Sequence, residues 1–141
     1  MNKHRLFVCL GTTLALSLLS AQGADNKGLD PSKLPPASDK TGVTYATDIK
    51  PVFEKSCVRC HGADKPKARL RLDSLEATLK GGDDGKVVLP GDSAGSMLVH
   101  YVAHAGKPDT YMPPPRNKAN IPPLTKDQIG LIRAWIDRGA K

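Results

Sequence analysis

Two cysteines and a histidine stand together in the segment KSCVRCHG, as Cys57, Cys60 and His61. Two thiols three positions apart at a helix end can each reach one vinyl group on the same edge of a porphyrin. The adjacent imidazole can then bind the iron from one face of the ring. This C-x-x-C-H order is the signature of c-type haem attachment. The motif therefore predicts one covalently bound haem c, attached to Cys57 and Cys60 and ligated by His61.

Other chemistries also use cysteines at this spacing. Cys57 and Cys60 with His100 and His104 read as a Cys2His2 zinc site, but 39 residues separate Cys60 from His100, and zinc fingers have about 12 to 15 there. A thiol–disulfide exchange site normally lies near a βαβ pattern, which this sequence lacks. A structural disulfide closing so short a loop would add little stability. We therefore favour haem over these alternatives.

The second axial ligand has four candidates, which are Met97, His100, His104 and Met112. Met112 stands in the segment DTYMPPPRN, directly before three prolines. These prolines fix an extended backbone without amide donors, so the chain can pass close to a flat apolar ring and leave few buried amides unpaired. A thioether is also a soft ligand that suits haem iron. Met112 is therefore the favoured second ligand. Met97, His100 and His104 stay as alternatives.

Residues 1–23 have the order of a secretory signal peptide. A basic start is followed by a 14-residue apolar run from Leu6 to Leu19 and then by small residues. The run is shorter than the about 20 residues of a membrane-spanning helix, although a retained anchor is the alternative. Cys9 lies inside this run and would leave with it. We expect an exported, for example periplasmic, protein without stable membrane insertion after cleavage.

The chain has a modest positive charge. Its formal net charge of +7 falls to +5 once the signal peptide with Lys3 and Arg5 is removed. No run of Lys and Arg is dense enough to follow a nucleic acid, so we expect no nucleic-acid partner. The excess of positive charge is consistent with two interpretations. The basic residues are solvated surface charges, or they bind a redox partner protein with an acidic surface.

The exported part divides into a linker and one domain. Residues 24–42 are poor in residues that could form a core, and they predict a flexible linker. Residues 43–141 predict a single domain. Its aromatic residues number only five, so a buried cofactor would help to fill the centre.

Apolar periodicity in this domain predicts three helices and a shorter fourth, and no strand pattern, which indicates an all-α fold. The first helix should begin at Asp48 and run to Cys57. The second should span residues 92–106, with a cap at Asp92 or Ser93 and a stop at Gly106. The third should begin at the capping box of Thr125 and Gln128, carry the apolar stripe Ile129, Ile132, Trp135 and Ile136, and stop at Gly139. The shorter helix should run through residues 73–82, with a cap at Asp73 or Ser74 and a stop at Gly81 and Gly82.

These pieces resemble the class I cytochromes c, and more narrowly the planctomycete-type cytochrome c domain. The matching segments, in order, are DIKPVFEKSCVRCHG, LRLDSLEATLKGG, VLPGDSAGSMLV, YMPP and LTKDQIGLIRAWIDRGA. The resemblance covers about residues 45–141. It implies a small cytochrome c-like fold, in which three to four helices wrap around one covalent haem with His61 and Met112 as the axial ligands.

The function that this resemblance implies is electron transfer, without enzymatic activity. The alternative is a haem enzyme, or a sensor of a gas or peroxide, whose sixth iron position is open. Arg69 and Arg71, in the segment ARLRLD, are candidates for pairing with haem propionates, or they are solvated surface charges.

Overall fold

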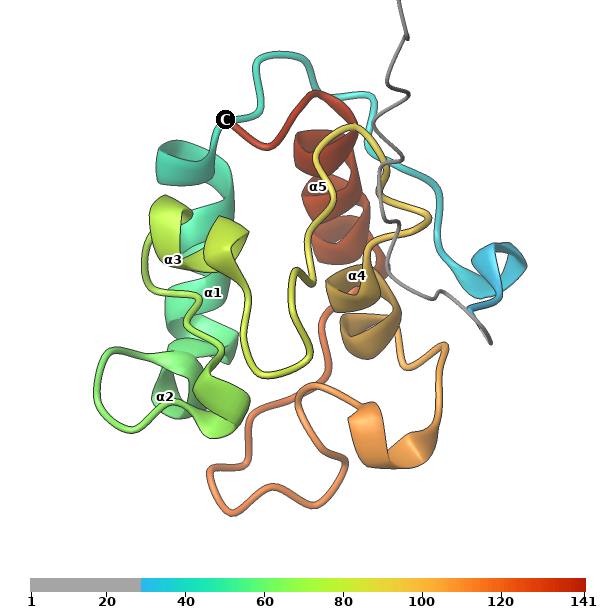
Figure 1. The fold of residues 1–141 in the computed structure, drawn as a ribbon. Coiled ribbons are helices and arrows are strands. Elements are labelled where there is room, and N and C mark those ends of the chain that lie inside the picture. Colours follow the sequence, from blue (N-terminus) through green and yellow to red (C-terminus); the bar gives the residue numbers. More distant parts are fainter. Residues whose placement is uncertain (1–28) are drawn as a thin grey trace, which may run out of the picture.

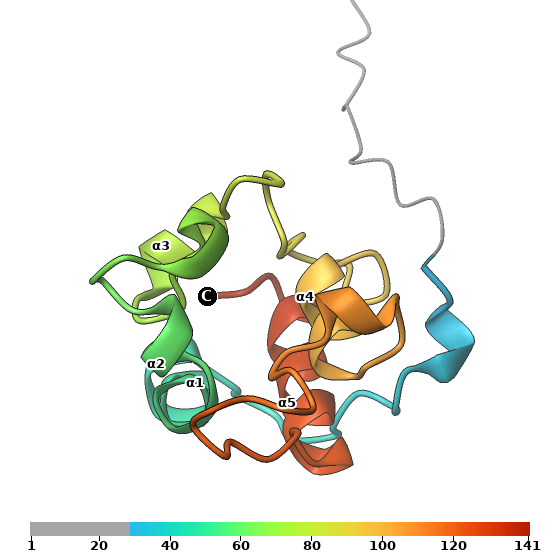
Figure 2. The ribbon, with the colours of Figure 1, turned by 90° about the horizontal axis from the view of Figure 1, so that it is seen from below.

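The computed structural model describes residues 29–141, so the predicted signal peptide, Cys9 and the start of the linker lie outside the described residues. The α-helices of this part are α1 (Lys50–Ser56), α2 (Val58–His61), α3 (Leu75–Lys80), α4 (Met97–Val102) and α5 (Lys126–Asp137). Helices α1, α2 and α3 lie on one side of the molecule, and α4 and α5 on the other (Figures 1 and 2). No β-strand occurs in residues 29–141, which confirms the all-α class, and none of their helices could cross a membrane.

Helix α5 forms as its sequence predicts. The Thr125 hydroxyl accepts a hydrogen bond from the Gln128 amide at 3.2 Å, and the Gln128 side chain accepts one from the Thr125 amide at 2.9 Å. Gly139 closes the helix in the left-handed region, at φ +95°. Its amide donates to Ile136, and the following amide donates to Trp135. These signals act within a few residues, so the sequence alone predicts both ends of the helix.

The core joins α5 to the first helical segment through aromatic rings. The predicted stripe of α5 is buried, and the Trp135 side chain is almost fully enclosed. Its ring lies 5.8 Å from that of Tyr45, which meets Phe53 edge-on at 6.2 Å. Tyr45 therefore stands between Trp135 of α5 and Phe53 of α1. The Lys141 carbonyl accepts hydrogen bonds from the Trp135 indole and the Tyr45 amide, which holds the last described residue beside the start of the first helical segment (Figure 1).

The first helical segment begins earlier than predicted. The chain turns helical at Tyr45 in a five-residue π-helical turn, Tyr45–Ile49, that leads directly into α1. Thr44 is the N-cap, because its hydroxyl accepts from the Thr47 amide. The prediction that Asp48 caps this helix is wrong. Asp48 lies inside the first turn and accepts a hydrogen bond from the Thr44 amide at 3.0 Å, so it satisfies the backbone donor of the N-cap residue.

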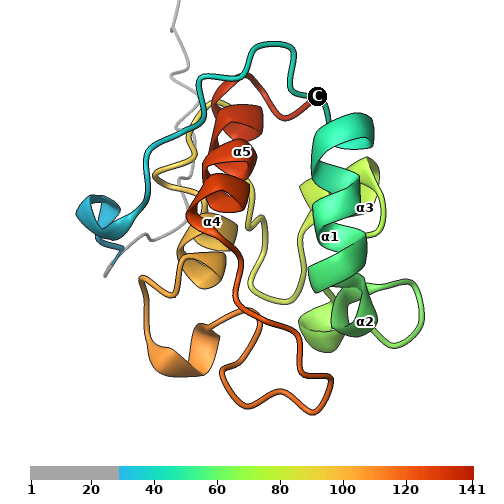
Figure 3. The ribbon, with the colours of Figure 1, turned by 180° about the vertical axis from the view of Figure 1, so that it is seen from behind.

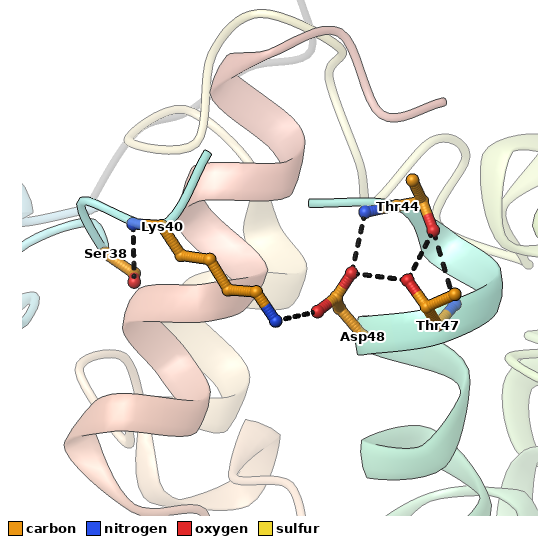
Figure 4. Close-up of polar contacts among 5 residues, drawn as sticks. All are labelled: Ser38, Lys40, Thr44, Thr47 and Asp48. Atoms are coloured by element: carbon orange, nitrogen blue, oxygen red, sulfur yellow. Dashed lines mark hydrogen bonds and ion pairs between the residues drawn. The ribbon is translucent and has the colours of Figure 1, made fainter. Parts of the chain in front are cut away.

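Asp48 is the centre of a polar cluster that ties the first helical segment to the arm before it (Figure 4). The Lys40 ammonium, the Thr44 amide and the Thr47 hydroxyl all donate to its carboxylate, whose side chain is only 6% exposed. These donors, Lys40 first, hold the pKa of Asp48 well below its ordinary 3.8. A carboxylate whose pKa is lowered on folding stabilises the native state above its unfolded pKa, and this stabilisation is lost as the pH falls below it.

We expect the substitution Asp48→Asn to lower the free energy of unfolding at neutral pH, because the amide keeps the shape but loses the charge that faces Lys40. Below about pH 4 the difference between the two proteins should shrink, since the Asp48 carboxylate of the unfolded chain takes up a proton there while the native carboxylate, with its lowered pKa, still does not. Urea denaturation of both proteins at neutral and acidic pH measures this difference. Asp39→Asn, at an exposed position of the same arm, is the matched control. A difference that stays constant with pH would contradict the assignment.

Helix α4 starts later than the sequence predicts. Residues 92–96 form a turn that their own side chains hold, with Asp92 accepting from the Gly95 amide and the Ser96 hydroxyl donating to the Asp92 carbonyl, both at 2.7 Å. Ser93 bonds to Asp137 of α5 through its amide at 2.8 Å and its hydroxyl at 3.0 Å. These side chains satisfy the backbone groups of the turn and connect it to α5, so neither Asp92 nor Ser93 caps the helix. Ser96 is the N-cap position.

The end of α4 is also displaced. The helix stops at Val102, and His104, not Gly106, takes the left-handed conformation after it, at φ +51°. The His104 amide donates to Tyr101 at 3.3 Å, and the next amide donates to His100 at 3.0 Å. This is the same pair of bonds that Gly139 and its successor make at the end of α5. A stop at Gly106 was the natural prediction because glycine adopts this conformation at the lowest cost.

An arm formed by the described residues before Val43 runs along α5 (Figure 3). The Ser38 amide donates to Gly130 at 2.9 Å, and the Arg133 guanidinium donates to the Pro35 carbonyl. A Cβ atom at Gly130 would lie 2.8 Å from a carbonyl of the arm, so only glycine permits this approach. The arrangement differs from the free linker that composition predicts, because Leu34 is buried and α5 supplies partners for the backbone. The domain boundary at residue 43 stays a prediction.

Candidate functional site

The two cysteines and the histidine of the motif lie on one tight turn. Helix α1 ends at Ser56, the chain kinks at Cys57, and α2 carries Cys60 and His61. The Cys57 carbonyl accepts hydrogen bonds from the Cys60 amide at 3.0 Å and from the His61 amide at 2.9 Å. The local sequence thus brings two sulfurs and an imidazole together without help from distant parts of the chain.

The orientation of the His61 ring is fixed by a carbonyl from another part of the chain. Its Nδ1 lies 3.0 Å from the Leu70 oxygen, and because a carbonyl can only accept, this nitrogen carries the proton. Nε2 then keeps a free lone pair, which is the form in which an imidazole ligates a metal. Burial is the main cause that lowers the pKa of His61, so the ring is neutral at neutral pH.

The surroundings of Cys57 disfavour a thiolate. Cys57 is buried, and this burial, together with the nearby Cys60, raises the pKa of the Cys57 thiol to about 12. Exchange sites and zinc sites need a thiolate, which low pKa values in electropositive, exposed surroundings provide. A thiol that adds covalently to a cofactor during maturation does not need this property in the finished fold.

Cys57, Cys60, His61 and Met112 all line one cavity of about 360 Å³. This volume lies within the range of about 300–1,000 Å³ for sites that enclose small molecules and cofactors. The loop that follows α4 lies at the same end of the molecule as α2, and this brings Met112 to the cavity (Figures 1 and 3). Two thiols, one imidazole and one thioether thus line the same cavity. This set of side chains fits a covalently attached haem.

The alternative axial ligands lie elsewhere. Met97, His100 and His104 are absent from the residues that line the cavity. The fully buried His100 bonds through Nε2 to the Ala94 carbonyl at 2.7 Å. Within residues 29–141 no group of three or more His, Cys, Asp or Glu side chains is placed to hold a metal ion, so the described chain has no Cys2His2 zinc site.

Tyr101 and Lys67 line the cavity and were not predicted as site residues. Tyr101 belongs to the apolar stripe of α4, and its hydroxyl lies 3.9 Å from the Met97 sulfur. Its carbonyl accepts the Met112 amide at 3.0 Å, and this bond fixes the loop at the residue that faces the cavity. The apolar spacing of α4 was a signal for burial of Tyr101, but it could not separate a core contact from a cofactor contact.

Arg69 and Arg71 lie in a neighbouring depression and do not line the cavity. Arg69 forms an ion pair with Asp83, and Arg71 bonds to Asp73 with two nitrogens, at 3.0 and 2.7 Å. Their own carboxylate partners therefore satisfy both guanidinium groups, as expected for solvated surface charges. Among residues 29–141, Lys67 is the one Lys or Arg side chain on the cavity wall, where the acidic side chains are Asp83, Asp84 and Asp109.

The sequence around the cavity matches a known protein family. The family model described as Planctomycete cytochrome C matches residues 57–116, which run from Cys57 past Met112. This match confirms the resemblance to the planctomycete-type cytochrome c domain over these residues. No curated protein and no solved structure matches the chain.

Proposed function

We propose that the protein is an exported monohaem c-type cytochrome that transfers electrons. One haem c is attached through Cys57 and Cys60, with His61 and Met112 as the axial ligands. The observation that carries the proposal is the cavity that these four side chains share, with Nε2 of His61 left free by the bond from Nδ1 to Leu70. Cytochrome c family membership of residues 57–116 supports the same cofactor.

When bound, haem supplies one-electron chemistry, and the protein contributes ligands, burial and an exposed edge. The two thiols keep the cofactor on the chain. The Leu70 carbonyl holds His61 in the tautomer that can bind metal and raises the basicity of its other nitrogen. Met112 offers a thioether, which raises the reduction potential relative to a second histidine.

Two filled axial positions favour a carrier over an enzyme. If His61 and Met112 both bind the iron, no open site is left for peroxide or a gas, and the coordination changes little between oxidation states. We therefore propose no enzymatic activity. The net positive charge after export suits redox partner proteins with acidic surfaces, and we propose neither a nucleic-acid partner nor stable membrane insertion.

The experiment that tests this function is carbon monoxide binding to the reduced wild-type protein. We expect sharp visible bands on reduction, reversible oxidation, and almost no spectral change when carbon monoxide is added, because a sulfur ligand already fills the sixth position. Rapid and complete binding of carbon monoxide would instead identify a sensor or enzyme with an open site. Stopped-flow absorption measures the rate and the extent of binding.

A further inference from the structure

The residue that ends α4 takes a backbone conformation that glycine adopts at lower cost. His104 occupies the left-handed position that Gly139 occupies after α5, and both close their helices with the same two backbone bonds. Gly81 takes a positive φ after α3 as well. A side chain at such a position carries a conformational cost that glycine avoids. Its presence suggests that the His104 side chain has a task that glycine could not perform.

The imidazole of His104 makes two contacts with the loop that carries Met112. Its ring stacks on Tyr111 with centroids 4.3 Å apart and planes within 2° of parallel. Its Nε2 lies 3.1 Å from the carbonyl oxygen of the buried Pro113, so that nitrogen donates the proton. The side chain thus contacts the residue before Met112 and the residue after it.

Met112 itself is held from the same helix end, by the bond from its amide to the Tyr101 carbonyl at 3.0 Å. Three consecutive loop residues therefore contact the end of α4. Tyr111 stacks on the His104 ring, and Met112 and Pro113 form hydrogen bonds with Tyr101 and His104. The triple proline after Met112 stiffens the loop but cannot decide where the loop lies relative to the cavity. The contacts with α4 decide that.

We propose that His104 is a positioning residue that keeps the Met112 sulfur at the cavity by clamping Tyr111 and Pro113. The inference rests on the proposed function for the role of the sulfur, although the clamp is a property of the loop alone. Its loss should leave the ligands and the fold in place and let the loop leave the cavity more often. The ligand would then exchange faster without being lost.

The substitution His104→Gly tests the clamp, because it removes the side chain and suits the left-handed backbone. We expect a free energy of unfolding close to that of the wild type, since relief of the backbone offsets the lost contacts. In the haem-loaded protein, hydrogen exchange of the Met112 amide should become about tenfold faster, the order expected for one lost hydrogen bond and one lost ring stack. Carbon monoxide binding to the reduced protein should speed up by a similar factor.

Two further variants make the outcome specific. Asn120→Gly makes the same kind of backbone change at φ +52°, in the long segment that joins the Met112 loop to α5, and should change neither rate. His104→Gln keeps an N–H donor without the ring and should restore part of the slow exchange, and it also tests the clamp should the glycine variant fold poorly. Unchanged Met112 exchange in both His104 variants would overturn the clamp, as would an equal acceleration in Asn120→Gly.

Failure of the clamp and failure of the proposed function give different results. If Met112→Ala opens the iron site while His104→Gly leaves amide exchange and carbon monoxide binding unchanged, only the clamp is wrong. If His104→Gly speeds amide exchange but Met112→Ala leaves the iron ligation unchanged, His104 does position the loop. The assignment of Met112 as a ligand then fails.

Discussion

Replacing Met112 with alanine will open the sixth iron position, lower the reduction potential and create fast carbon monoxide binding. A methyl group offers no donor, and Met112 is the methionine of the described chain that lines the cavity. A thioether favours ferrous iron, so the potential should fall by a sizeable fraction of the range of about 0.8 V that axial ligands span. Optical titration of the potential and carbon monoxide binding measure both effects.

Met97→Ala is the matched control for this experiment. Met97 is partly buried against the core and lies on α4, but it does not line the cavity. Its loss should reduce stability modestly and leave the iron spectrum and the potential unchanged. A Met112→Ala protein that keeps a low-spin spectrum, while His100→Ala becomes high-spin, would place the distal ligand on α4 and contradict the site.

Features that depend on a few neighbouring residues could be predicted from the sequence. The capping box of α5, its glycine stop and the Ser74 cap of α3 are present because each is a local hydrogen-bond pattern. The close placement of Cys57, Cys60 and His61 is local in the same sense. Hydrogen bonds between near neighbours in the sequence therefore determine these features, without a tertiary contact.

Features decided by distant partners could not be predicted. His104, not the expected glycine, takes the left-handed conformation after α4, and its side chain bonds to Pro113, nine residues further on. Arg69 was a candidate for a propionate but pairs with Asp83, fourteen residues further on. The arm before residue 43 looked unable to order itself, and the surface of α5 supplies the partners that its own sequence lacks.

The double substitution Cys57→Ala/Cys60→Ala should leave little stable helical protein. Without the cofactor the domain would keep a cavity of about 360 Å³ beside its core. The apolar side chains that line this cavity would then be exposed to water instead of packing against the cofactor. Small domains are stable by only about 5–15 kcal/mol, so the loss of these contacts is decisive. Circular dichroism and thermal unfolding measure the loss, with Arg59→Ala, at the exposed position between the thiols, as the control.

The visible spectrum of the fully denatured wild-type protein, purified from an exporting host, tests covalent haem attachment most directly. We predict that one haem per chain stays with the polypeptide after unfolding and solvent extraction, and that the Arg59→Ala control behaves in the same way. The double cysteine variant should release any haem that it carries. A wild-type chain that this host exports without haem, or whose haem separates from the chain on denaturation, would contradict covalent attachment through Cys57 and Cys60.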